Sequence, residues 1–522
     1  MSQLSPSDTK GISPVTLTLV GVAFLVVIPL VFFGGPGYYG DDLNLITALG
    51  EGGFAGALRQ WFDHYGFGYR PLGISLDFIL YGLFGDIPAA AYAINTAVFL
   101  CIALVIYRSM LGITGDEAVA VIVATFFALF PFGPTAYLQL SSFCMLVGIL
   151  LVVPLAGIFL SLSQQYESWI GPWTISAIWG AVLLIYEQPV GLYAFFGIVL
   201  IAHFCLKPPA VQYKAVIKLC TTMTITTAAF LALYLIHPGN PKIVSLKTIL
   251  GESVGIAAVG AASLGTPAGS ESIVVPARPT AAAQPVVFDQ SRMQKLVRFF
   301  IENIGYPIQN LRSKPSSLIA FFGVLALVAV GIFRIRVRII SQRMAARYVL
   351  LGTSWSFLTI LPFFLYGRFT APPYVFVLPS IGAGVASYGL YWLLLPAKLG
   401  ASLRVGLLKI LSVVVMGLFT LQQYGYFFGL KDELRYSRML AERVATEKEE
   451  ILRGVTIIVD GVPLRAHDHI FWLKKAVGNR AFISELGGAF SDIEVRESGV
   501  GTLKISIPHI LSGQVESKLI VY

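Results

Sequence analysis

The sequence contains a series of long apolar runs, each close to the length that a membrane-spanning helix requires. About 20 consecutive apolar residues cross the hydrocarbon core of a bilayer. Two runs, Ala118–Phe132 and Trp173–Tyr186, are shorter and need help from neighbouring helices to span. The other nine runs are Val15–Phe33, Ala89–Tyr107, Ala136–Leu160, Pro189–Leu206, Ala215–Ile236, Ser316–Phe333, Tyr348–Tyr366, Tyr374–Leu395 and Val405–Phe428.

The composition agrees with a polytopic membrane protein. Charged residues make up 12% of the 522 residues, whereas about 25% is usual in soluble domains. The net charge of +9 is attributed to basic loops kept in the cytoplasm. No basic stretch alternates with stacking aromatic residues, so nucleic acid is not an expected partner. The four cysteines lie in or beside apolar runs without a CxxC pair, so neither a disulfide nor a structural zinc is expected.

The basic residues also predict the orientation of the helices. The densest basic loop holds five arginines between Arg334 and Arg347, and the positive-inside rule places this loop in the cytoplasm. With eleven spans, the N-terminus is then inside, while residues 34–88, residues 237–315 and the C-terminal tail are outside. The interpretation is that of a bacterial inner membrane protein with its active site facing outward.

This orientation requires that Leu72–Phe84 does not cross the membrane. The segment is short and carries Asp77 at its centre, and we expect a helix on the outer membrane surface. In the alternative scheme the segment crosses, and Trp173–Leu206 fuses into one helix. That fused helix measures about 50 Å at about 1.5 Å per residue, which far exceeds about 30 Å of hydrocarbon.

The predicted fold class is an all-α polytopic membrane protein of about eleven helices with a small C-terminal α+β domain. Its predicted parts are a cytoplasmic N-terminus (1–14), a transmembrane domain (15–429) and an extracytoplasmic domain (430–522). The last domain begins with a charged helical stretch, Lys431–Arg453. The alternating patterns of the tail predict strands at Val455–Val459, Thr502–Ile507 and Leu519–Tyr522.

An acidic pair, Asp41-Asp42, follows directly after the first apolar run. Adjacent carboxylates repel, so one of them holds its proton more tightly unless a cation or a substrate lies between them. A carboxylate of this kind suits a general base near neutral pH. The structural alternative is that Asp42 only caps a helix that begins at Leu43.

Further candidate residues for substrate binding lie in the predicted outer loops. Arg70 precedes Pro71, which restricts the local backbone, and its guanidinium is able to fork onto a phosphate or to snorkel at the interface. Glu187 lies between two apolar runs, where a carboxylate is costly unless it is functional or faces outer water. The remaining candidates in these loops are His64, Tyr69, His237 and Arg368.

These residues resemble the GT-C superfamily, whose members are membrane glycosyltransferases that use polyprenyl-phosphate sugars. The resemblance rests on the acidic pair, on Tyr69-Arg70-Pro71-Leu72, on Glu187-Gln188-Pro189 and on Gly367-Arg368-Phe369. It covers roughly Val15–Leu395 and is strongest to the membrane half of tetratricopeptide-containing O-mannosyltransferases and their bacterial relatives. The usual arginine–tyrosine pair is Arg368-Phe369 here, and no tetratricopeptide repeat follows.

The resemblance implies an inverting transfer of a sugar to an envelope glycan, glycolipid or protein. Asp41, assisted by Asp42, takes the proton of the acceptor hydroxyl, while Arg70 and Arg368 neutralise the departing polyprenyl phosphate. His64, Tyr69, Glu187 and His237 line the cavity. A divalent metal at Asp41 and Asp42 is left open by this resemblance, since superfamily members differ in this respect.

Two other classes of function compete with this prediction. A transporter or flippase of a lipid-linked or small anionic substrate places ionisable residues at mid-bilayer, in broken helices of an internal repeat. No repeat is found in the sequence. A noncatalytic scaffold that presents the tail domain gives no reason for the acidic pair or for Arg70.

Overall fold

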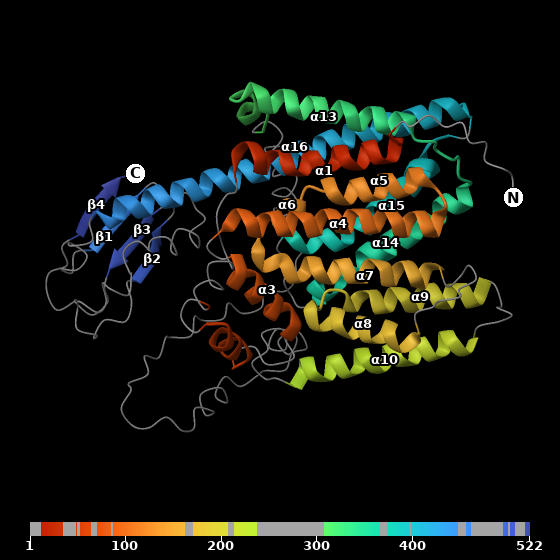
Figure 1. Ribbon diagram of the computed structural model, residues 1–522, viewed down its shortest axis with the longest axis horizontal. Coiled ribbons are helices and arrows are strands. Elements are labelled where there is room, and N and C mark those ends of the chain that lie inside the picture. The colour runs from red at the N-terminus through yellow and green to blue at the C-terminus, as the bar shows by residue number, and fades with distance from the viewer. Residues whose placement is uncertain are drawn as a thin grey trace.

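The chain forms one bundle of helices with a small sheet beyond one end of it (Figure 1). The computed structural model describes residues 12–34, 49, 53–63, 70–84, 87–161, 171–206, 213–236, 307–365, 373–396, 398–446, 456–460, 494–499, 502–506 and 517–521. In Figure 1 the start of the first helix, α1 (Pro14–Phe33), and the sheet lie at opposite ends of the bundle.

Each of the eleven predicted apolar runs contains a helix. These helices are α1 (Pro14–Phe33), α4 (Pro88–Thr114), α5 (Glu117–Leu129), α7 (Phe143–Ser161), α8 (Pro172–Ile185), α9 (Val190–Leu206), α10 (Tyr213–Ile236), α13 (Pro315–Arg334), α14 (Gln342–Leu365), α15 (Val377–Leu394) and α16 (Ala401–Ala445). Shorter elements connect them, namely α3 (Pro71–Phe84), α6 (Gly133–Tyr137), η1 (Leu140–Ser142) and η4 (Pro373–Phe376).

Within the described ranges, six helices are long and apolar enough to cross a membrane by themselves, namely α1, α4, α13, α14, α15 and α16. Six shorter apolar helices accompany them. The chain is therefore a multi-pass membrane protein made mainly of helices. The count of eleven spans stays a prediction, because it depends on the shorter helices crossing as well.

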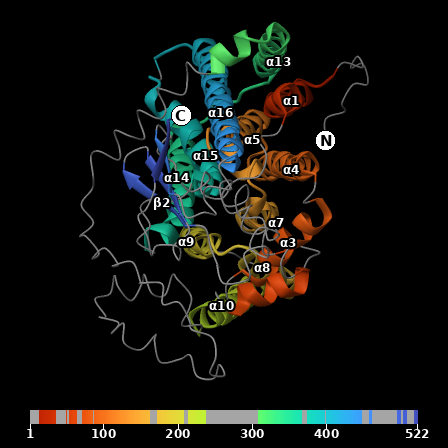
Figure 2. The same ribbon diagram turned by 90° about the vertical axis from the view of Figure 1, so that its left-hand side faces the viewer.

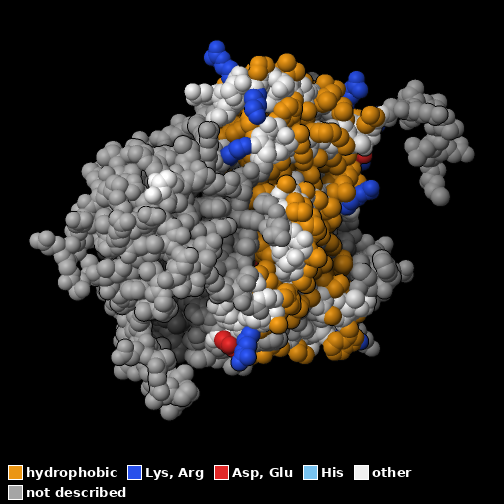
Figure 3. Space-filling model, turned by 60° about the vertical axis from the view of Figure 1, so that its left-hand side comes forward, with side chains coloured by type: hydrophobic (Ala, Val, Ile, Leu, Met, Phe, Trp, Pro, Cys, Tyr) orange, Lys and Arg blue, Asp and Glu red, His pale blue; other side chains and the backbone are white. Residues whose placement is uncertain are grey.

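The outer surface of the bundle has the character of a lipid-facing surface. Many large apolar side chains are exposed on it, among them Phe24, Leu350 and Leu394. Figure 3 shows a broad hydrophobic surface over the described helices, with Lys and Arg side chains mostly around its edges. In water such a surface drives association, whereas in a bilayer the lipid chains cover it.

Local sequence signals explain where the helices begin. Proline is the first residue of α1, α3, α4, α8 and α13, where its missing N–H costs no hydrogen bond. The Ser13 hydroxyl accepts from the Thr16 N–H at 3.0 Å and so caps α1. The Asp116 carboxylate accepts from the Ala118 N–H at 2.9 Å and caps α5.

Small residues bring two helix pairs close together. Gly352 on α14 faces Gly382 on α15, and a side chain at either position would collide with the backbone of the other helix. On α13, Gly331 leaves room for Thr18 of α1 in the same way. Close backbone approach of this kind is how membrane helices gain packing energy, because lipid offers no hydrophobic driving force between them.

The predicted run Ala136–Leu160 is not one helix. The chain forms α6 and η1 first, and α7 begins only at Phe143. Polar groups from two other helices make this break possible by bonding the backbone there. The Asn95 amide of α4 donates to the Gln139 carbonyl at 3.1 Å, and the Asp77 carboxylate of α3 accepts from the Cys144 N–H at 3.0 Å.

The fused helix of the alternative topology is wrong, because α8 ends at Ile185 and α9 begins separately at Val190. The predicted surface segment Leu72–Phe84 corresponds to α3. This helix contacts the end of α8 and the start of α7, with Gly73 against the Ile185 carbonyl and Asp77 against Cys144. Figure 2 shows α3 beside α7 and α8 in the lower part of the bundle. That α3 lies on the outer membrane surface and does not cross the membrane stays a prediction.

Among the described residues that follow α16 there are four strands. They are β1 (Thr456–Asp460), β2 (Glu494–Gly499), β3 (Thr502–Ser506) and β4 (Ser517–Val521), in the order β2-β3-β1-β4. Strand β3 pairs antiparallel with β1 and β2, while β4 pairs parallel with β1. The predicted domain boundary at residue 430 falls inside α16, which continues to Ala445 (Figure 1). The division into domains stays a prediction.

The orientation predicts a difference in labelling between the two ends of α13. Ser313, just before this helix, and Ser341, after it, are both exposed. With the native cysteines replaced, we expect Ser313→Cys to react with an impermeant thiol reagent in intact cells. Ser341→Cys should react only after the cells are permeabilised, because the positive-inside rule predicts that its loop is cytoplasmic. The reverse pattern would overturn the orientation.

Candidate functional site

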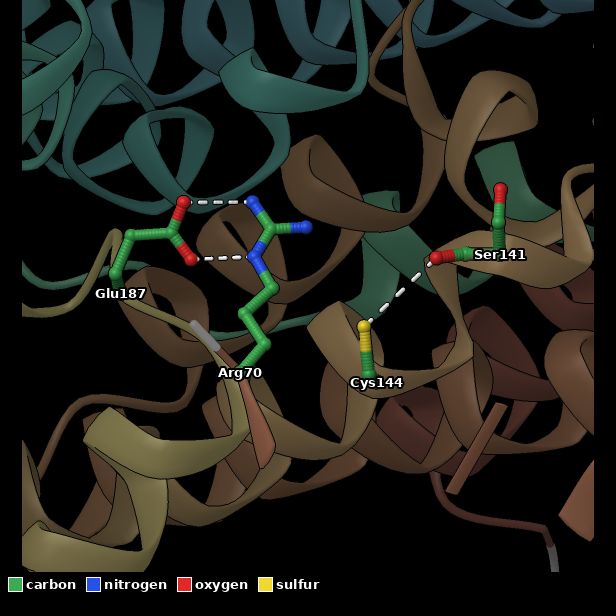
Figure 4. A network of polar contacts seen from close by, with 4 residues as sticks. All are labelled: Arg70, Ser141, Cys144 and Glu187. Carbon is green, nitrogen blue, oxygen red and sulfur yellow. Dashed lines mark hydrogen bonds and ion pairs between the residues drawn. The ribbon is translucent and has the colours of Figure 1, made fainter. Parts of the chain in front are cut away.

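An ion pair joins two of the predicted site residues across 117 positions of sequence. The Arg70 guanidinium donates through Nε to Oε2 of Glu187 at 2.5 Å and through Nη2 to Oε1 at 2.7 Å. Figure 4 shows the two side chains face to face, with both contacts drawn. Two parallel bonds to one carboxylate fix the position of both groups, which a single contact would not do.

The ion pair lies largely out of contact with solvent. The Glu187 side chain is 2% exposed and the Arg70 side chain 19%. Glu187 is therefore not a turn residue that faces outer water, which was the structural alternative for it. The carboxylate is tolerated because the guanidinium neutralises it, and an unpaired charge would be very costly there.

The backbone at Arg70 is bent into a conformation that residues with a side chain rarely adopt. Its φ of +52° lies in the left-handed region, which costs about 1–3 kcal/mol. Pro71 disfavours the right-handed helical region for the residue before it, and the Arg70 carbonyl accepts the first helical bond of α3 from Ile74 at 2.9 Å. The start of α3 therefore aims the guanidinium away from its own helix and toward the turn between α8 and α9.

The same turn supplies an aromatic platform. The Arg70 guanidinium carbon lies 4.6 Å from the centre of the Tyr186 ring, which is buried. A cation over an aromatic face is attracted by the ring's negative charge density. Tyr186 and Glu187 thus hold Arg70 from two directions.

Gln188, the next residue, ties this turn to α14 and to η4. Its side-chain amide donates to the carbonyl of Thr359 in α14 at 3.3 Å and to that of Val375 in η4 at 2.8 Å. The Gln188 side chain is fully buried. Adjacent residues of one turn therefore connect α3 with the chain that follows the Arg368 loop.

Close packing of α3 supports the geometry of the ion pair. Gly73 lies so near to the Ile185 carbonyl that a β-carbon would collide with it. The Asp77 carboxylate, which is 3% exposed, accepts from the first turn of α7. The Cys144 thiol contacts the Ser141 carbonyl at 3.7 Å, beside the ion pair in Figure 4. The end of α8 and the start of α7 therefore pack against α3, the helix that begins next to Arg70.

The other predicted site residues lie outside the described residues. They are Asp41, Asp42, His64, Tyr69, His237 and Arg368. Their roles, and the metal left open at the acidic pair, stay predictions. In the parts of the chain that the structure describes, no group of three or more His, Cys, Asp or Glu residues is placed to hold a metal ion.

Tyr186, Gln188 and Asp77 were not among the predicted site residues. Each left a signal in the sequence. Tyr186 and Gln188 flank Glu187 in an otherwise apolar region, and Asp77 is the single charge in the run Leu72–Phe84. The pairing of Arg70 with Glu187 was not predicted. Each residue was expected to bind the substrate by itself, and their separation by 117 positions gives no sign that they are in contact.

Comparison with known proteins leaves the family open. No family model matches the chain, and no curated protein matches it. Among solved structures, the chain is similar to an oligosaccharyltransferase from Archaeoglobus fulgidus in its apo form, with 13% identity and a TM-score of 0.34. The similarity covers 79% of this chain and 56% of that one, so the chain spans little more than half the length of that protein.

Two glycines of α3 provide a matched test of the packing around the ion pair. Gly73→Ala places a methyl group against the Ile185 carbonyl, and overpacking of this kind costs about 1–3 kcal/mol. Gly82→Ala meets nothing within 4 Å and should be neutral or stabilising by up to about 1 kcal/mol. We expect only Gly73→Ala to lower the thermal unfolding temperature in detergent. Equal unfolding temperatures for the Gly73→Ala and Gly82→Ala variants would contradict this packing.

Proposed function

We propose that this protein is an inverting glycosyltransferase that moves a sugar from a polyprenyl-phosphate donor to an envelope acceptor. The acceptor is a glycan, a glycolipid or a protein, and the reaction takes place on the extracytoplasmic face of a bacterial inner membrane. The observation that carries the proposal is the buried, bidentate pair of Arg70 and Glu187 at one end of an apolar bundle.

The location of this pair suits a lipid-phosphate donor. Such a donor has its hydrocarbon chain in the bilayer and its phosphate at the membrane surface, so an enzyme must offer a cation at the ends of its helices. Arg70 precedes the first residue of α3, and α1, the helix before Asp41-Asp42, ends at the same end of the bundle (Figure 1). Gln188 holds η4, the element after the Arg368 segment, beside Glu187.

The buried carboxylates of the described residues favour an enzyme over a transporter. They are Asp77, Asp116 and Glu187. Asp116 caps α5, Asp77 is bonded to the first turn of α7, and Glu187 lies in the turn between α8 and α9. Asp116 and Glu187 are at helix ends, and Asp77, in the middle of α3, accepts from the first turn of α7, whereas a transport pathway places ionisable groups near the middle of the bilayer.

In the proposed reaction the acceptor hydroxyl attacks the anomeric carbon from the face opposite to the phosphate. Asp41, assisted by Asp42, takes the proton of that hydroxyl as the new glycosidic bond forms. The bond from the sugar to the phosphate breaks, and its electrons leave with the polyprenyl phosphate. Negative charge then grows on the phosphate, and cations fixed beforehand stabilise it best.

Arg70 is the proposed phosphate-binding cation, and Glu187 is a positioning residue that acts through it. A free arginine side chain loses much conformational freedom when it binds a ligand. Here the bidentate pair and the Tyr186 ring restrict the guanidinium before the donor arrives. The left-handed backbone at Arg70 fits this role, since strain of this kind collects at functional sites.

Asp41→Asn tests the proposed reaction directly. It keeps the shape of the side chain but removes the proton acceptor, so turnover of a lipid-linked sugar by purified protein should fall about 100- to 10,000-fold. Asp63→Asn is the control, because Asp63 is also on the segment between α1 and α3 and its side chain is 73% exposed. Near-normal turnover by Asp41→Asn would refute the mechanism. Equal loss in Asp42→Asn, together with inhibition by a chelator, would indicate a metal at the pair.

A double-variant cycle separates the structural from the functional role of the ion pair. Glu187→Leu removes the carboxylate that neutralises the largely buried Arg70 guanidinium and should destabilise the protein by about 3–5 kcal/mol. Combining it with Arg70→Met removes both charges and should restore most of that stability, yet turnover should stay lost. Removing the exposed pair of Arg59 and Asp63 should change stability by no more than about 1 kcal/mol.

The outcome of this cycle decides the role of Arg70. Full turnover by the stable double variant would mean that the pair only holds the helices together. In that case the phosphate would be bound by another cation, of which Arg368 is the next candidate. Arg70→Lys should retain more turnover than Arg70→Met but less than the wild type. It keeps the positive charge, but an ammonium group cannot form the bidentate contact with Glu187.

A further inference from the structure

Five arginines lie between the end of α13 and the second turn of α14. We call this segment, residues 334–347, the arginine strap. It contains no lysine and no acidic residue. Among the described residues, no carboxylate forms an ion pair with any of the five arginines. Their side chains are all exposed, and they are Arg334, Arg336, Arg338, Arg343 and Arg347.

Hydrogen bonds fix both ends of the strap. Residues 335–341 form neither helix nor strand between α13 and α14. Before them, the Lys409 ammonium group of α16 donates to the Phe333 carbonyl at 2.7 Å. After them, the Ser341 hydroxyl accepts from the Met344 N–H at 3.3 Å, at the start of α14. The backbone that carries the arginines is therefore held in place at each end.

Apolar side chains attach the middle of the strap to the bundle. Ile335 is buried, and Val337 and Ile340 pack against the same hydrophobic core. Arg336 and Arg338 alternate with them and are exposed. One side of the strap thus packs on the helices, while the other side presents guanidinium groups to the surroundings.

Large apolar side chains are also exposed among these arginines. Phe333 is 47% exposed, Ile339 51% and Met344 38%. A nucleic acid would neutralise the arginines but has no hydrocarbon to cover such side chains. A phospholipid bilayer meets both requirements, because its phosphates lie directly above the boundary of its acyl chains.

The strap lies at the border of the apolar bundle. It follows directly after α13, which is long and apolar enough to cross a membrane. Gly331, in the last turn of α13, packs against Thr18 near the start of α1. Figure 1 shows these two helix ends away from the sheet, whereas α3, the helix after Arg70, lies toward the other end of the bundle. The strap is therefore separate from the candidate site.

We propose that the arginine strap binds headgroups of anionic phospholipids in the leaflet at this end of the bundle. The guanidinium groups contact headgroup phosphates, which a guanidinium fork matches better than an ammonium group does. Ile339 and Met344 enter the boundary between headgroups and acyl chains. Anionic lipids are preferred because a zwitterionic headgroup carries its own cation, which the strap repels.

Native mass spectrometry of the purified full-length protein tests this preference. The probes are phosphatidylglycerol and phosphatidylcholine with the same acyl chains, and the quantity measured is the affinity of the first lipid bound. Since each arginine near an anionic surface contributes about fivefold to binding, the wild type should prefer phosphatidylglycerol about 10- to 100-fold. The triple variant Arg334→Gln, Arg336→Gln and Arg338→Gln should reduce this preference about tenfold or more.

A charge-matched control separates the strap from the net charge of the protein. Arg108, Lys218 and Lys398 are exposed cations near the ends of other helices at the same end of the bundle. Changing these three to Gln removes the same charge, but cations that lie apart cannot share one headgroup. This variant should therefore keep the preference within about twofold. Lysine at the three strap positions should keep only part of it, because the fork is lost.

A spin label tests the position of the strap in the membrane. With the native cysteines replaced, the label is attached to Ile339→Cys in phosphatidylglycerol vesicles. Oxygen concentrates in hydrocarbon, whereas a neutral nickel complex stays in water. We expect the label to collide more often with oxygen than with the nickel complex, because Ile339 enters the acyl boundary.

Three results would overturn the proposal. An equal loss of preference in the strap variant and in the charge-matched control would mean that net charge alone attracts the lipid. Collisions of the label mainly with the nickel complex would place the strap in water. Displacement of phosphatidylglycerol by an equal concentration of free glycerol 3-phosphate would indicate a site for soluble anions instead.

Discussion

A carboxylate buried among apolar helices needs a partner, and Glu187 finds one in Arg70, which also stacks on Tyr186. This requirement shapes the surrounding fold. It fixes the start of α3 against the turn between α8 and α9. Since the next residue, Gln188, bonds to α14 and η4, one short turn holds α3, α14 and η4 together at this end of the bundle.

The bundle follows two rules of membrane proteins at once. Lipid-facing surfaces are apolar, and the helices approach each other through small residues such as Gly352 and Gly382. Where regular helix is interrupted, as before α7, a side chain from another helix satisfies the backbone. The buried polar groups at the ends of the helices thus define where the chain turns, and the same groups form the candidate site.

The helices were predictable because each apolar run contains the information for its own helix. Hydrophobic length is a local property, and it placed both ends of α1 and α13 and the start of α4 within one residue, although α4 continues to Thr114 beyond the predicted end at Tyr107. Predictions that needed a second segment were less successful. The break inside Ala136–Leu160 depends on Asn95 and Asp77, which lie 40 or more positions away in the sequence.

The sequence by itself determined that the chain is a multi-pass membrane protein, which of its stretches are helices, and that Arg70 and Glu187 are unusual in their surroundings. These conclusions follow from local composition, since about 20 consecutive apolar residues form a helix that is stable in the bilayer wherever they occur in the sequence. Only the tertiary structure decided that Arg70 and Glu187 neutralise each other and that Gln188 joins the turn between α8 and α9 to α14 and η4. Each of these depends on distances between segments far apart in the chain, which packing sets and sequence order does not.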